Sequence, residues 1–87
     1  MKKILIVEDD KDISIELKAL LENSGYEASI LTDFKNASDS IIAAEPDLVL
    51  LDINIPYMNG EMLLQQLRSK SDVPVIMVTS RDSEADE

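Results

Sequence analysis

The stretch "DLVLLD", residues 47–52, restricts the fold more than any other part of the sequence. Its apolar residues follow one another without polar alternation, which is typical of a strand in a parallel sheet with helices on both faces. The runs "KILIV" at 3–7 and "PVIMVT" at 74–79 have the same character, and "YEASIL" at 26–31 reads as a further strand. The sequence therefore predicts four buried strands.

The segment after the first strand has the pattern of an amphipathic helix. Asp10 or Asp12 can cap it, and Gly25 can end it. Its apolar residues repeat at i, i+4, i+7 and i+8, which places them on one face: Ile13, Leu17, Leu20 and Leu21.

Two more helices are expected between the remaining strands. One runs through "FKNASDSIIAAE" at 34–45, with Thr32 or Asp33 as its cap and Pro46 just beyond its end. The other covers about residues 60 to 69. The order β-α-β-α-β-α-β predicts a parallel sheet with right-handed crossovers.

Composition narrows the classes of function. The 87 residues allow at most one small domain. With 18 acidic and 8 basic residues the net charge is −10, so this segment lacks the positive surface that binds nucleic acid. There is no cysteine or histidine, so a metal would need oxygen ligands, which favours magnesium, calcium or manganese. The first apolar run is too short for a signal peptide or membrane span, and a cytoplasmic protein is the expectation.

Acidic and hydroxyl residues follow three of the predicted strands. Glu8 and Asp9 come after the first, Asp52 ends the third, and Thr79 and Ser80 end the fourth. Because all strands of a parallel sheet end on the same side, these residues are expected on one rim, where open α/β sheets bind ligands. Carboxylates crowded together repel unless a cation lies between them, and magnesium suits an open cleft of this kind.

Each of these residues also has an ordinary structural explanation. Glu8 and Asp9 alone could be solvated loop acids, Asp52 alone a turn residue, and the hydroxyls unremarkable strand ends. The joint pattern favours a single site over four separate coincidences.

Four motifs together resemble the receiver domain of a two-component response regulator: "ILIVEDD", "PDLVLLDINIP", "PYMNG" and "VPVIMVTS". The resemblance covers essentially all 87 residues. It implies a flavodoxin-like, doubly wound parallel sheet of βα repeats with strand order 2-1-3-4, in which the fifth strand and last helix of the family are missing. Residues 1–87 would thus be one receiver domain, incomplete at the C-terminus.

The resemblance also implies roles for the residues of the rim. Asp52 would be the phosphoacceptor, and Glu8 and Asp9 would bind Mg²⁺ together with Asp52 and the backbone carbonyl of Asn54. Thr79 would be the switch hydroxyl that turns toward the phosphoryl group. The implied partners are a sensor histidine kinase and a C-terminal effector domain, of which a DNA-binding domain is a common form.

The family's lysine, cis-proline and switch aromatic, which belong to the end of its fifth strand, have no counterpart in this sequence. Lys70 cannot replace that lysine, because it falls between the third helix and the fourth strand. The resemblance therefore predicts an intact phosphoacceptor. The residues with which the family responds to phosphorylation have no counterpart in this sequence.

Two alternative functions fit parts of the pattern. A haloacid-dehalogenase-type phosphohydrolase also uses an Asp after an apolar strand, but it needs a second Asp where this chain has Asn54. The other alternative is a module that is not phosphorylated and associates through the open edge of the fourth strand, as a homodimer or a swapped dimer.

Overall fold

The structure is a computed structural model that describes residues 2–52 and 60–78. Strands and helices alternate along these residues as the sequence predicts. In chain order they are β1 (Lys3–Val7), α1 (Lys11–Asn23), β2 (Glu27–Ile30), α2 (Ala37–Ala44), β3 (Leu48–Asp52), α3 (Gly60–Arg68) and β4 (Val75–Val78).

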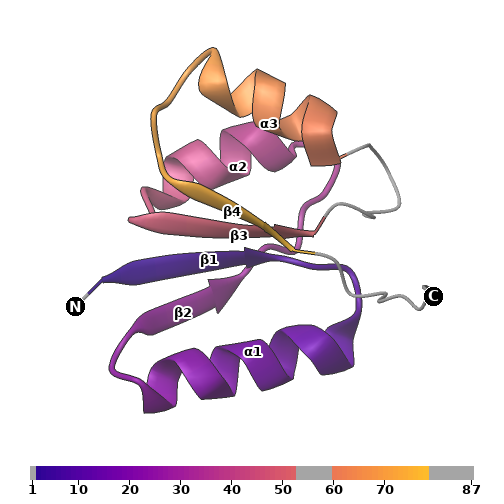
Figure 1. Cartoon of the computed structure of the whole chain (residues 1–87). Helices are drawn as coiled ribbons and strands as arrows, with labels where there is room; N and C mark the ends of the chain where they lie inside the picture. The colour runs from indigo at the N-terminus through magenta and orange to yellow at the C-terminus, as the bar shows by residue number, and fades with distance from the viewer. Residues whose placement is uncertain (1, 53–59, 79–87) are drawn as a thin grey trace, which may run out of the picture.

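The four strands form one parallel sheet in the order β2-β1-β3-β4. Helix α1 lies on one side of the sheet and helices α2 and α3 lie on the other (Figure 1). This arrangement confirms the predicted doubly wound sheet and its strand order. Within the described ranges, no helix is long and apolar enough to cross a membrane.

The main core lies between the sheet and the pair α2 and α3. Alternate residues of β1 and β3 point into it and meet buried side chains of both helices. Its members are Leu5, Val7, Leu31, Ala37, Ile41, Val49, Leu51, Leu63 and Leu67. The apolar stripe of α3 thus supplies Leu63 and Leu67, which are completely buried.

Helices lie on both faces as predicted, but within the described residues the face on the side of α1 is covered only in part. On β3, Val49 and Leu51 are completely buried, whereas Leu48 and Leu50 on the opposite face are partly exposed. Ile76 of β4 is 50% exposed. Of the helices that the structure describes, α1 alone lies on this side of the sheet, and it packs on β2 and β1.

Helix α1 begins at the predicted place, and Asp10 is its cap. The Asp10 carboxylate accepts hydrogen bonds from the backbone N–H groups of Asp12 (3.0 Å) and Ile13 (3.2 Å). Gly25 follows the helix with a φ of +95°, a conformation that glycine adopts without a steric penalty. The predicted stripe is wrong in one member, because Leu20 is 61% exposed.

Helix α2 begins later than predicted. Its N-cap is Asn36, which makes no side-chain capping hydrogen bond, so the expected caps Thr32 and Asp33 are wrong. Asp33 instead holds the preceding loop, where its carboxylate accepts a hydrogen bond from the Asn36 N–H at 3.3 Å. The helix ends at Ala44, and its C-cap Glu45 takes a left-handed φ of 52° directly before Pro46.

Asp47 fixes the start of β3 against β1. Its backbone N–H donates to the carbonyl oxygen of Lys3 (2.8 Å), and its carboxylate accepts from the Lys3 N–H (2.7 Å). This reciprocal pair sets the register of the two central strands at their amino ends, and that register determines which residues meet at their carboxyl ends.

Candidate functional site

Three carboxylates meet at the carboxyl ends of the two central strands. Val7, the last residue of β1, is paired with Leu51, so Glu8 and Asp9 emerge beside Asp52 at the end of β3. Carboxylate oxygens of these three acids all lie within 4.8 Å of one another. The structure thus brings together the three acidic residues that the sequence placed on one rim.

The three acids differ in their exposure to solvent. Asp52 is completely buried and Glu8 is 4% exposed, whereas Asp9 is exposed. Asp52 is the last residue of β3 and Glu8 directly follows β1, so the paired strands fix the positions of both acids. The site therefore has a buried floor of two carboxyl groups and one acid at its opening.

Burial raises the pKa of Glu8 from 4.5 to about 7. The Asp10 N–H, which donates to Glu8 Oε2 at 3.2 Å, opposes this rise, but a hydrogen bond with the Asp52 side chain and the nearby charges of Asp52 and Asp9 add to it. Two carboxyl groups that share a hydrogen bond need a proton between them. Without a cation, the site therefore holds a proton near neutral pH.

The donor set suits a hard divalent cation. It consists of carboxylate oxygens only, it is open to solvent at Asp9, and its members are close enough for one ion to contact all three. A cation there would replace the proton and remove the repulsion that raises the pKa of Glu8. Magnesium, which binds one or two carboxylates and keeps several waters, fits such a site.

The other predicted site residues, Asn54, Thr79 and Ser80, lie outside the residues that the structure describes. Their roles remain predictions.

A cavity of about 330 Å³ adjoins the acids on the side of α1 and β2. Its lining combines the two acids that follow β1 with residues that the sequence analysis did not assign to the site: Lys11, Ser14, Ile30, Leu31, Thr32 and Phe34. These residues come from α1, β2 and the loop after β2, so no local motif could have revealed them.

Comparison with known families agrees with this geometry. Residues 4–87 match the pattern of the response regulator receiver domain. This chain belongs to the response regulator receiver family. The match confirms the predicted family and favours it over the phosphohydrolase alternative.

Relatives of known description extend well beyond the matched region. The sensory transduction protein RegX3 of Mycobacterium tuberculosis is 46% identical over 86 residues, which are 99% of this chain and 38% of RegX3. The transcriptional regulatory protein YxdJ of Bacillus subtilis is 40% identical over 87 residues, again 38% of its length. The receiver chain thus spans well under half of these proteins.

Solved receiver domains have the same fold. The N-terminal domain of the nisin resistance regulator NsrR is 40% identical, with a TM-score of 0.84 over 99% of this chain and 73% of that one. The BeF3-activated receiver domain of Klebsiella pneumoniae RstA is 34% identical, with a TM-score of 0.84 over 95% of this chain and 71% of that one. The receiver here therefore shares both sequence and backbone arrangement with domains of established structure.

Proposed function

We propose that this receiver accepts a phosphoryl group on Asp52 from a sensor histidine kinase. The position of Asp52 carries the proposal, because it ends the central strand β3 and its carboxylate lies within 4.8 Å of those of Glu8 and Asp9. A carboxylate oxygen of Asp52 attacks phosphorus while the bond to the phosphohistidine nitrogen breaks, and the imidazole leaves with that electron pair. The product is an acyl phosphate on Asp52.

Glu8, Asp9 and Asp52 would hold a magnesium ion, and the backbone carbonyl of Asn54 is proposed as a further ligand. When bound, this ion supplies positive charge to the phosphoryl oxygens. Strand pairing between β1 and β3 supports the proposal because it fixes Asp52 beside the acids that follow β1. Burial of the Asp52 carboxylate restricts the approach of water to it.

Thr79 is proposed to donate a hydrogen bond to the phosphoryl group once Asp52 is modified. The regulatory output is proposed to be transcription, since YxdJ is named a transcriptional regulatory protein and this chain spans 38% of its length. A net charge of −10 argues that DNA contacts would come from an effector domain rather than from these residues.

The test is intact mass spectrometry after incubation with a small acyl phosphate and Mg²⁺. We expect one phosphoryl group on the wild-type chain and none on Asp52→Asn, while Asp72→Asn, which changes an exposed acid far from the rim, should behave as wild type. Chelation of Mg²⁺ should abolish the modification. An equal adduct yield in Asp52→Asn would refute the assignment of the phosphoacceptor.

A further inference from the structure

The cavity of about 330 Å³ beside the acids opens at the carboxyl ends of β1 and β2. Glu8 and Asp9 contribute to its lining from the site, and the other lining residues come from the start of α1, the end of β2 and the loop after β2. Strand β2 forms the opposite edge of the sheet from β4. The volume of the cavity suits a small molecule that binds next to the rim.

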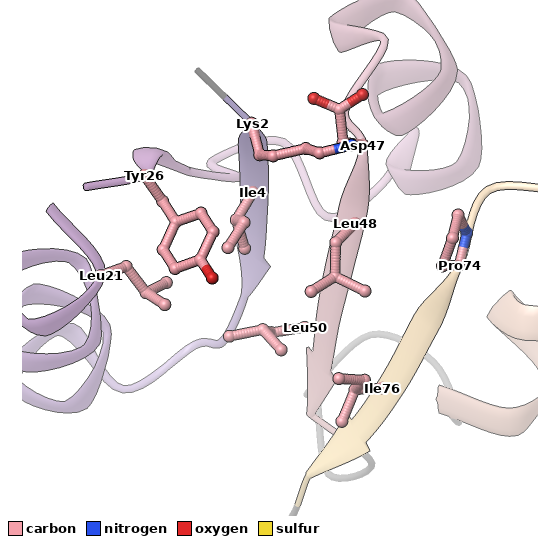
Figure 2. Close-up of a pocket in the computed structure, with 9 residues that line it drawn as sticks. All are labelled: Lys2, Ile4, Leu21, Tyr26, Asp47, Leu48, Leu50, Pro74 and Ile76. Atoms are coloured by element: carbon pink, nitrogen blue, oxygen red, sulfur yellow. The ribbon is translucent and has the colours of Figure 1, made fainter. Parts of the chain in front are cut away.

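A second, larger cavity of about 500 Å³ extends from the amino ends of the strands. Figure 2 shows Lys2, Asp47 and Pro74 around it, and these residues directly precede β1, β3 and β4. The three acids of the rim are not among its lining residues. A ligand that reacts at Asp52 therefore finds its neighbouring contacts in the smaller cavity.

Lys11, the first residue of α1, is the one cation among the described residues that line the smaller cavity. Lys11 is exposed, and its ammonium group makes no ion pair with another described residue. The hydroxyl of the buried Ser14 donates a hydrogen bond to the Lys11 backbone carbonyl at 3.0 Å, which holds the backbone of Lys11 in the first turn of the helix. The ammonium group of Lys11 is therefore available to bind an anion in the cavity.

The backbone at the start of α1 is less available to an anion than the Lys11 side chain. The Asp10 carboxylate accepts hydrogen bonds from the N–H groups of Asp12 and Ile13, and the Asp10 N–H donates to the Glu8 carboxylate. These bonds occupy donors that a helix N-terminus otherwise offers to an anion. Phosphoryl oxygens that enter the cavity therefore depend on the Lys11 ammonium group.

The lining of the cavity has a polar part and an apolar part. The polar part is formed by the two acids, Lys11 and two hydroxyl residues, and the apolar part by Ile30, Leu31 and Phe34. Acyl phosphates have the same division, because an anionic phosphoryl group is attached to a small acyl group. An anionic donor is repelled by a chain with a net charge of −10, so a cation beside the rim favours its approach.

We propose that Lys11 binds small acyl phosphate donors, with the acyl group in this cavity and the phosphoryl group between Lys11 and Asp52. This inference rests on the proposed role of Asp52 and adds the donor class and the residue that binds it. A carboxylate oxygen of Asp52 attacks phosphorus, the bond from phosphorus to the acyl oxygen breaks, and the donor's carboxylate leaves with that electron pair. Lys11 holds the donor in place and forms no covalent bond with it.

Binding of acetylphosphonate tests this assignment without phosphoryl transfer, because its carbon–phosphorus bond does not break. An NMR titration of the backbone amide signals in Mg²⁺ should show shifts at Ser14 and Thr32, which line the cavity. Lys11→Gln should raise the dissociation constant about fivefold to tenfold, whereas Lys11→Arg keeps the charge and most of the affinity. Lys35→Gln is the matched control, since Lys35 is exposed next to Phe34 but does not line the cavity.

The affinity for Mg²⁺ separates donor binding from a general effect of charge. Removal of a cation beside three carboxylates should leave Mg²⁺ binding unchanged or make it tighter. Weaker binding of acetylphosphonate without weaker binding of Mg²⁺ is therefore the result expected for Lys11→Gln. Loss of Mg²⁺ binding in this variant would indicate a structural role and overturn the proposal. Amide shifts confined to residues outside the cavity, or equal changes in Lys11→Gln and Lys35→Gln, would also overturn it.

Phosphorylation kinetics separate the role of Lys11 from the role of Asp52. With acetyl phosphate and saturating Mg²⁺, Lys11→Gln should raise the donor concentration that gives half the maximal rate about fivefold to tenfold and change the maximal rate little. A lower maximal rate with unchanged half-saturation would show that Lys11 does not bind the donor. Equal phosphorylation of wild type and Asp52→Asn would refute the phosphoacceptor alone, because the acetylphosphonate titration tests Lys11 without any phosphoryl transfer.

Discussion

Glu8→Gln should stabilise the receiver in the absence of divalent cations. The pKa of Glu8 is raised from 4.5 to about 7, mainly by burial. Each pKa unit corresponds to about 1.4 kcal/mol, so ionised Glu8 lowers the free energy of unfolding by about 3 kcal/mol. The free energy of unfolding of a chain of this size is about 4–13 kcal/mol. The substitution should therefore raise it by a large fraction.

The sign of the effect follows from proton binding. Between pH 4.5 and about 7 the folded state keeps a proton on Glu8 that the unfolded chain has released. Stability is therefore lost as pH rises through this window, and glutamine, which mimics the protonated form, does not suffer the loss. The difference between variant and wild type should be about 1 kcal/mol near pH 5 and about 3 kcal/mol near pH 8.

Urea unfolding followed by circular dichroism in EDTA measures this difference. Glu16→Gln is the control, because Glu16 is exposed on α1, and its free energy of unfolding should stay parallel to that of wild type across the pH range. Unfolding free energies of wild type and Glu8→Gln that also run parallel from about pH 5 to pH 8 would refute the argument that burial and neighbouring carboxylates hold a proton at Glu8.

Magnesium provides a second arm of the same experiment. If Glu8, Asp9 and Asp52 bind the ion, added Mg²⁺ should raise the stability of wild type near pH 8, because an ion that binds only the folded state stabilises it. The Glu8→Gln variant lacks one ligand charge and should gain less, so the gap between the two proteins should narrow. An equal gain in stability in wild type and Glu8→Gln would show that Glu8 is not a ligand of the ion.

Three further substitutions test the fold. Asp10→Ala should cost about 1 kcal/mol of unfolding free energy through loss of the α1 cap, and chemical denaturation measures it. Ile41→Ala should cost about 2–5 kcal/mol in the same assay, because Ile41 is completely buried between α2 and the sheet. Lys70→Ala should change the thermal midpoint little, because its ion pair with Asp39 is exposed and worth less than about 1 kcal/mol.

Most of the fold could be predicted from the sequence because the apolar runs and the turn residues between them indicate the same strands and helices. Apolar runs marked the four strands to within a residue or two, and turn residues such as Gly25 and Pro46 separated them from the helices. Strand order came from the family resemblance, since the alternation of strands and helices alone does not fix it. The proximity of Glu8 and Asp52 then followed from parallel pairing of β1 with β3.

The parts that could not be predicted depend on packing between distant elements. Helix α2 lacks a side-chain cap, so a sequence search for a capping residue chose one too early in the loop. The apolar run of β3 indicated burial on both faces, but it could not show that Leu48 and Leu50 are partly exposed among the described residues. The pKa of Glu8 likewise depends on burial beside Asp52, which only the folded chain creates.

Asp52 is the last of the β3 residues that point to one face of the sheet. Leu48, Leu50 and Asp52 share one face of β3, as Ile6 and Glu8 share the corresponding face of the chain at β1. Along both strands the row of apolar residues ends at the carboxyl end in a buried acid. An ionised carboxylate at Glu8 lowers the free energy of unfolding, which agrees with the raised pKa of Glu8. Buried acids with a raised pKa occur mainly at functional sites. The position of these acids supports the proposal that the rim binds a cation and a phosphoryl group.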